Sequence, residues 1–250
     1  MKSMLFWMTL PVMLPQAVAL RRSAPRFASA AGPTEGSVGS GRDVRLLAIG
    51  DSIVAGVGAR LLSRALVGQT ALALAERGDV RVQWQAIGKS GMTAGRFIET
   101  RLDRLPRQAP DYVIVSLGVN DVTSLSTVTR WRRNLCTLFE TLADRYPGTL
   151  VAFAGMPPLS GFPLLPQPLR AWVGMRGRIF DRASAEVAGD YDFVEHVPLE
   201  FDTDPAAFAD DGFHPNEDSY AIYGSEMAAA ISRFRPPISG TGLDSSLSSA

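Results

Sequence analysis

The chain has 250 residues, of which 46% are hydrophobic and 20% charged, so it can bury a core and is not a disordered polymer. Its 25 Lys and Arg residues are matched by 25 Asp and Glu residues. This zero net charge argues against a nucleic-acid partner, because binding phosphates needs surplus cations. One cysteine excludes an internal disulfide and a thiolate-rich metal centre, and two histidines far apart in the sequence do not predict another kind of metal site.

The N-terminal segment differs from the rest of the chain. Residues 4–20 are almost wholly apolar and follow Lys2, which is typical of a signal-peptide core. Two prolines interrupt this run, it is shorter than the roughly 20 residues that cross a bilayer, and arginines follow it. We interpret residues 1–30 as a signal- or anchor-like segment, with an interfacial or packed segment as the alternatives. This favours a secreted, periplasmic or membrane-associated protein that contacts a membrane through residues 1–30, and leaves a cytoplasmic location open.

Changes in composition mark the ends of one domain. Residues 31–42 (AGPTEGSVGSGR) are rich in Gly and Ser, which predicts a linker. Residues 236–250 are of low complexity and lack an apolar period, which predicts a disordered tail. The remainder, 43–235, has the size of one domain. Residues 1–41 carry a net charge of +3 and the rest −3, so the N-terminal arm is the basic part of the chain.

Inside the domain, short apolar runs alternate with longer amphipathic ones. The apolar runs predict strands at 44–50, 80–87, 112–118, 150–154 and 191–197. The amphipathic runs predict helices at 59–77, 126–145, 169–188 and 216–234. Because strand–helix alternation requires crossover connections, the sequence predicts a three-layer α/β/α sandwich with a mainly parallel sheet.

Polar residues and glycines follow the predicted strands, where open α/β sheets bind their ligands. Gly-Asp-Ser at 50–52 comes after the first strand, and Gly-Lys-Ser-Gly at 88–91 after the second. Gly-Val-Asn-Asp at 118–121 comes after the third, and Asp-Gly-Phe-His-Pro-Asn at 211–216 precedes the last helix. We therefore expect a pocket at the carboxyl ends of the strands.

These four segments, in this order, resemble the SGNH/GDSL hydrolase family of serine esterases and lipases over roughly residues 44–234. The family's hallmark positions match Ser52, Gly91, Asn120 and His214. The resemblance implies that Ser52 is the nucleophile, that His214 is the general base and then acid, and that Asp211 orients the histidine. It also implies an oxyanion hole made by the backbone N–H groups of Ser52 and Gly91 and the side-chain amide of Asn120. The implied fold is flavodoxin-like, and the implied reaction needs no cofactor.

Single residues of this set have simpler interpretations. Taken alone, Ser52 would be read as a helix cap, and Asn120 with its neighbour as a turn, but the four segments together favour catalysis. Asp210 competes with Asp211, and the three-residue offset from the histidine favours Asp211. His196, in a strand pattern, is interpreted as a structural histidine.

Some positions depart from the family pattern. Ile53 replaces the leucine of the usual Gly-Asp-Ser-Leu block, a mild change. Ala86 and Met92 stand where many relatives carry an Asn and an acidic residue, which leaves the subfamily and the substrate open.

The favoured function is hydrolysis of carboxylic esters through an acyl-enzyme intermediate, with a small-molecule ester as the partner. Lipid-like or simple acyl esters fit the apolar connection 156–168, in which four residues are expected to border an acyl pocket: Leu159, Phe162, Leu164 and Leu165. A carbohydrate deacetylase or an acyltransferase would use the same site. From another class, the chain could be a catalytically weak binding module tethered to a membrane. The sequence leaves the oligomeric state open.

Overall fold

A computed structural model describes residues 15–16, 28–199 and 202–234. The expected tail at 236–250 and nearly all of the apolar run at 4–20 lie outside the described residues. Within the described part of the chain, no helix is long and apolar enough to cross a membrane.

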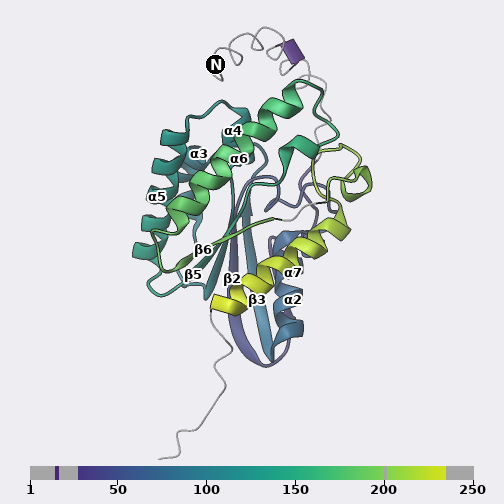
Figure 1. The fold of residues 1–250 in the computed structure, drawn as a ribbon. Helices are drawn as coiled ribbons and strands as arrows, with labels where there is room; N and C mark the ends of the chain where they lie inside the picture. The colour runs from purple at the N-terminus through teal and green to yellow at the C-terminus, as the bar shows by residue number, and fades with distance from the viewer. Residues whose placement is uncertain (1–14, 17–27, 200–201, 235–250) are drawn as a thin grey trace, which may run out of the picture.

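Six strands form one sheet (Figure 1), and their order in it is β1-β3-β2-β4-β5-β6. The five strands other than β1 pair in parallel, and β1 pairs antiparallel with β3 at one edge. Their bounds are β1 (Glu35–Gly39), β2 (Arg42–Gly50), β3 (Val80–Gly88), β4 (Tyr112–Ser116), β5 (Leu150–Ala154) and β6 (Val194–Val197).

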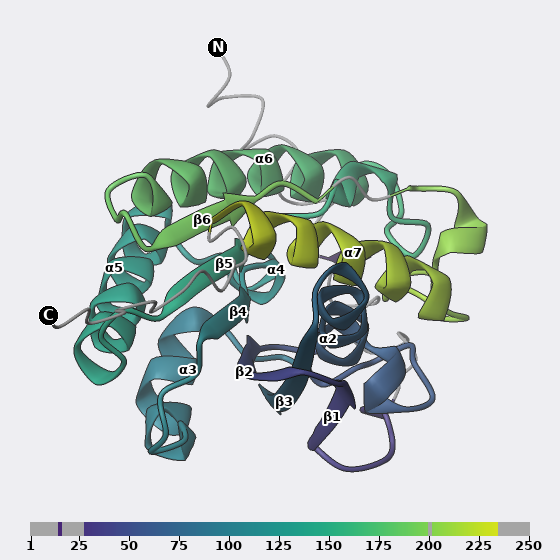
Figure 2. The same ribbon diagram turned by 90° about the horizontal axis from the view of Figure 1, so that it is seen from below.

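Helices cover both faces of the sheet (Figure 2). On one face lie α2 (Leu66–Arg77) and α7 (Glu217–Phe234). On the other lie α3 (Ala94–Arg101), α5 (Val128–Arg145) and α6 (Leu169–Ala188), together with the short α4 (Val119–Thr123). The expected three-layer α/β/α fold with a mainly parallel sheet is confirmed.

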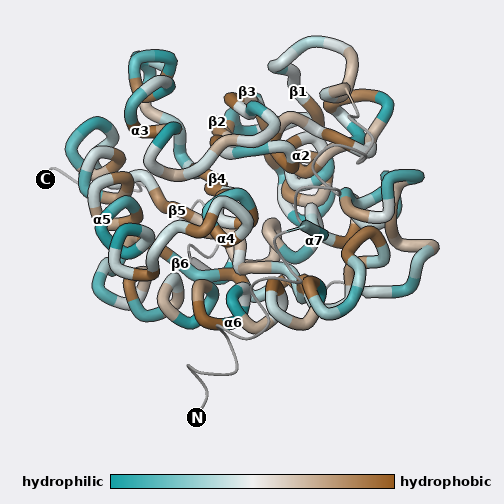
Figure 3. The backbone as a smooth tube through the Cα atoms, turned by 90° about the horizontal axis from the view of Figure 1, so that it is seen from above, coloured by the Kyte–Doolittle hydropathy of each residue, from teal (hydrophilic) through white to brown (hydrophobic). Residues whose placement is uncertain are grey.

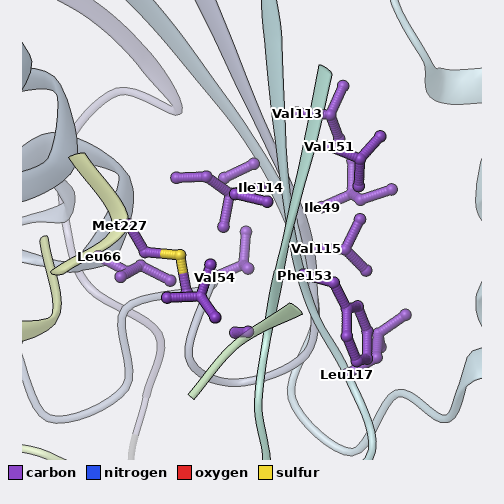
Figure 4. Close-up of a cluster of buried hydrophobic side chains, with 14 of the residues drawn as sticks. Ile49, Val54, Leu66, Val113, Ile114, Val115, Leu117, Val151, Phe153 and Met227 are labelled. Atoms are coloured by element: carbon purple, nitrogen blue, oxygen red, sulfur yellow. The ribbon is translucent and has the colours of Figure 1, made fainter. Parts of the chain in front are cut away.

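The central strands are apolar because both of their faces are buried, and Figure 3 shows hydrophobic residues concentrated on them. Figure 4 shows how side chains alternate across β4. Val113 and Val115 point to the side of Phe153, whose ring packs against α5, while Ile114 points to the side where Leu66 and Met227 lie. The strands are thus held between two apolar layers.

The expectation of a linker at 31–42 is wrong for residues 35–39, which form β1. This edge strand carries a single apolar residue, Val38, and two glycines, so it has none of the apolar pattern of a buried strand. Gly36 is needed there, because a Cβ at this position would lie 2.6 Å from the ring of Trp84 on β3. The domain therefore begins before residue 43.

Other boundaries also differ from expectation. The helix expected at 59–77 starts at residue 66, after a separate 3-10 turn at Leu62–Arg64. The strand expected at 191–197 starts at Val194, because residues 192–193 form a turn. The helix α3 was not expected at all, since its eight residues are too few to show a clear period.

Candidate active site

Ser52 and His214 lie 162 positions apart in the sequence, and the fold brings them together at the carboxyl end of the sheet. Ser52 is the second residue after β2, and His214 stands in the loop that leads into α7. The Oγ of Ser52 lies 3.0 Å from Nε2 of His214, and Nδ1 of the same ring lies 2.5 Å from Oδ2 of Asp211. The three residues form one continuous chain of hydrogen bonds.

The carboxylate of Asp211 is buried and fully engaged. Its Oδ1 accepts hydrogen bonds of 2.9 Å from the backbone N–H groups of both Phe213 and His214, while Oδ2 faces the imidazole. Burial alone would raise the pKa of Asp211, but the hydrogen bonds from His214 and Phe213 outweigh it and hold that pKa below its usual value. Asp211 therefore stays ionised beside the histidine.

Asp210, the competing candidate, is exposed to solvent. Gly212 follows Asp211 with a φ of +62°, a left-handed conformation that lets the loop turn back towards the histidine.

The residues expected to form the oxyanion hole also lie at this edge. Asn120 is the second residue of α4, and its Nδ2 donates to Oδ2 of Asp51 at 3.0 Å and to the carbonyl of Met92 at 3.1 Å. The second bond ties Asn120 to the segment that contains Gly91. Gly91 has a φ of +76°, and a Cβ there would meet no atom within 4 Å, so its backbone borders open space.

Two buried carboxyl groups flank Asn120, and motif reasoning did not assign either of them a role. Asp51 accepts from Asn120 and, at 3.1 Å, from the Ile53 N–H, while Asp121 accepts from the Ala94 N–H at 3.0 Å. Burial raises the pKa of Asp51 and that of Asp121 to about 6 each. Asp51 precedes Ser52 and Asp121 follows Asn120 in the sequence. This adjacency to the motif residues is the feature that could have indicated that the two carboxyl groups belong to the site.

An apolar cavity opens beside Ser52 and His214 and encloses about 40 Å³. Its wall comes from the ends of β4 and β5, from the loops after them, and from α2 and α7. The apolar lining includes Leu66, Leu117, Val119, Met156, Phe162, Phe213, Tyr223 and Met227.

Of the four residues expected to border an acyl pocket, Phe162 alone is part of this wall. Leu159 and Leu165 are buried in the core, and Leu164 binds the loop of Asp211 through a hydrogen bond of 3.0 Å from its N–H to the Gly212 carbonyl. Met156 and Pro157, at the start of the connection, also line the cavity, so the connection forms part of the wall and packs behind it elsewhere.

His196 is engaged elsewhere. Its Nε2 lies 2.9 Å from Oδ1 of Asp181, which also accepts from the Met156 N–H at 2.7 Å. The pair braces the loop after β5, which is the structural role expected for this histidine. Among the residues that the structure describes, no group of three or more His, Cys, Asp or Glu side chains could hold a metal ion.

Comparison with known proteins identifies the class. Residues 48–222 match the model of the GDSL-like lipase/acylhydrolase family, and the chain belongs to this family. A GDSL-like esterase of Mycobacterium tuberculosis is 27% identical over 204 residues, which are 76% of this chain and 62% of that protein. The match therefore spans less than two thirds of this relative's length.

Solved structures share the fold. A carbohydrate esterase family 2 enzyme of Corynascus thermopiles has a TM-score of 0.61 at 17% identity, over 79% of this chain and 68% of that one. A structure described as TesA has a TM-score of 0.59 at 22% identity, over 76% and 99% of the two chains. A putative platelet activating factor from Streptococcus pneumonia has a TM-score of 0.59 at 20% identity, over 92% and 97%.

Proposed function

We propose that the protein is a serine esterase that hydrolyses carboxylic esters, with Ser52 as the nucleophile. The observation that carries this proposal is the chain of hydrogen bonds from Ser52 through His214 to Asp211 at the mouth of an apolar cavity. A serine hydroxyl attacks a carbonyl only when a base removes its proton, and Nε2 of His214 lies within reach of that proton.

In the proposed reaction, Oγ of Ser52 bonds to the ester carbonyl carbon while its proton passes to Nε2 of His214. The ionised Asp211 stabilises the resulting imidazolium and keeps its Nδ1–H in place. The imidazolium then gives the proton to the leaving alcohol as the C–O bond breaks, and an acyl-enzyme remains. Water, activated by the same imidazole, resolves it, while the N–H groups of Ser52 and Gly91 and the amide of Asn120 stabilise each oxyanion.

The size of the cavity bears on the acyl group. One water needs at least about 10–15 Å³ of space accessible to a water-sized probe, so the 40 Å³ enclosed here is enough for a short acyl group. We therefore place esters of short acids first among the substrates. An acetylated carbohydrate is the second candidate, because solved structures with this fold include carbohydrate esterases.

The test is an assay on p-nitrophenyl esters from acetate to decanoate, followed by acetylated sugars. Activity of the wild type with loss of at least about 10³-fold in both Ser52→Ala and His214→Ala is the expected result. Ser63→Ala, which removes an exposed hydroxyl on the Leu62–Arg64 turn, serves as the control and should keep full activity. Hydrolysis that persists in Ser52→Ala, or a wild type inactive on every ester, would overturn the proposal.

A further inference from the structure

Both hydrogens of the Asn120 amide already have acceptors in the structure. One points to the carboxylate of Asp51, with an Nδ2–Oδ2 distance of 3.0 Å, and the other to the Met92 carbonyl at 3.1 Å. An oxyanion formed on the substrate must therefore share one of these hydrogens or displace one acceptor. The Met92 carbonyl is neutral and Asp51 is an acid, so the two acceptors are not equivalent.

The carboxyl group of Asp51 is arranged as an ionised acceptor. It is 2% exposed, its Oδ1 accepts from the Ile53 N–H, and its Oδ2 accepts from Asn120. A protonated carboxyl keeps some acceptor capacity but is neutral, so it would accept these two hydrogen bonds more weakly than the carboxylate does. The ionised carboxylate binds one hydrogen of the Asn120 amide more strongly than the neutral Met92 carbonyl binds the other. The hydrogen that faces Met92 is thus the one that an incoming oxyanion can take.

We propose that Asp51 is a positioning residue of the reaction, whose carboxylate fixes the Asn120 amide so that its second hydrogen is available to the oxyanion. The same carboxylate binds the backbone directly after Ser52 and therefore sets the distance between the nucleophile turn and the oxyanion donor. This inference rests on the esterase function proposed above.

The carboxyl group has titratable neighbours on several elements. His214, in the loop before α7, and Asp121, on α4, both act on its charge. The Tyr220 hydroxyl of α7 is also near, because Asp51 contributes to raising the pKa of Tyr220. Burial is the main reason why the pKa of Asp51 is about 6, and His214 opposes that shift when it is protonated. The ionised form, which holds both donors more strongly, therefore prevails at neutral pH and is lost below pH 6.

A double-mutant cycle in kcat tests the proposal. Asn120→Ala should lower kcat about 10²–10³-fold, and Asp51→Asn about 10- to 100-fold with little change in KM. If Asp51 acts through Asn120, the double variant Asp51→Asn/Asn120→Ala should be no slower than Asn120→Ala alone. A double variant whose losses multiply would overturn the proposal while leaving the esterase function standing, whereas an inactive wild type would remove the esterase function itself.

Asp111→Asn is the matched control, because Asp111 also accepts a backbone hydrogen bond, from the Arg45 N–H at 2.8 Å, but lies at the opposite end of β4. Its kcat should match the wild type.

A second measurement needs no folded Asp51 variant. The side-chain amide resonances of Asn120, identified by their loss in Asn120→Ala, should be protected from exchange at pH 7.5 and should shift as the pH falls through about 6. Rapidly exchanging resonances that do not titrate would overturn the contact, and with it the proposal.

Discussion

Asp211 is the residue on which the orientation of His214 depends. Its two oxygens accept three hydrogen bonds, one from the imidazole and two from the backbone N–H groups of the same loop, so loop and ring are held by one carboxylate. The neighbouring Asp210 is exposed. Two adjacent aspartates therefore differ completely in environment, and this difference allows a matched test.

Asp211→Asn should lower kcat by about 10³–10⁴-fold, because an amide cannot accept from the imidazole and the backbone donors as the carboxylate does. Asp210→Asn should stay within about twofold of the wild type, since a change to an exposed group costs little. Steady-state kinetics of both variants on the best p-nitrophenyl ester measures the two values of kcat and shows which aspartate matters. Equal losses of kcat in the two variants, or a larger loss in Asp210→Asn, would show that Asp211 does not orient the histidine.

The burial of Asp121 predicts how the free energy of unfolding depends on pH. Its pKa is raised to about 6 in the folded protein, above the ordinary value of 3.8, because burial disfavours the charged form. Between pH 6 and 4 the folded state therefore binds more protons than the unfolded state, and the free energy of unfolding contributed by this group rises as the pH falls. Since one pKa unit corresponds to about 1.4 kcal/mol, the rise from 3.8 to about 6 has a full effect on the order of 3 kcal/mol.

The comparison variant is Asp121→Asn, which keeps the shape and removes the titration. Urea unfolding at pH 7.5 and pH 5 should show that the wild type gains stability relative to the variant at the lower pH. A difference between the two proteins that is the same at both pH values would contradict the raised pKa of Asp121.

Among the elements, β1 and β2 show what the sequence can and cannot reveal. The apolar run of β2 identifies a strand buried on both faces, and the residues after it identify the site. No such run marks β1, because an edge strand that exposes one face and contains two glycines has the composition of a linker. The helices α5 and α6 were predicted well because each has about five turns of amphipathic pattern, whereas α3 has only two.

Gly36 on β1 packs too closely against Trp84 to accept a side chain without a loss of stability. Gly36→Ala should lower the free energy of unfolding by about 1–3 kcal/mol, because the new methyl would lie 2.6 Å from the rigid Trp84 ring and the strand or the ring must shift. Gly78→Ala is the matched control, since its Cβ would meet no atom closer than 3.9 Å. Thermal and urea unfolding would reveal the difference, and equal stability of the two variants would mean that β1 is not packed as described.

The molecule as a whole places the site where its layers meet. The motifs predicted Ser52, Asn120, Asp211 and His214, and the fold accounts for their convergence, because the carboxyl ends of parallel strands share one edge of the sheet. The wall of the cavity could not be predicted in the same way. It combines Leu66 of α2 and Tyr223 and Met227 of α7 with the ends of β4 and β5, and no pattern along the sequence indicates which residues from distant segments will meet.

We expect the acyl-chain preference of the proposed esterase to depend on this cavity wall. Phe162 closes part of the cavity and packs edge-to-face against Phe208 and Phe213, with ring centroids 5.1 and 5.2 Å away. Phe162→Ala should enlarge the enclosed space and raise the ratio of kcat/KM for octanoate to that for acetate by about tenfold or more, at a cost of about 3–5 kcal/mol in stability.

Leu164→Ala is the control for this change, because Leu164 comes from the same connection but does not line the cavity, and its hydrogen bond to Gly212 is made by the backbone. Its ratio of octanoate to acetate activity should equal that of the wild type. Both variants are assayed below their unfolding temperatures. Any remaining loss of folded protein lowers the octanoate and acetate rates by the same factor and leaves their ratio unchanged. If the two variants shift the ratio equally, the cavity beside Ser52 does not hold the acyl group, and chain length must be set by another surface.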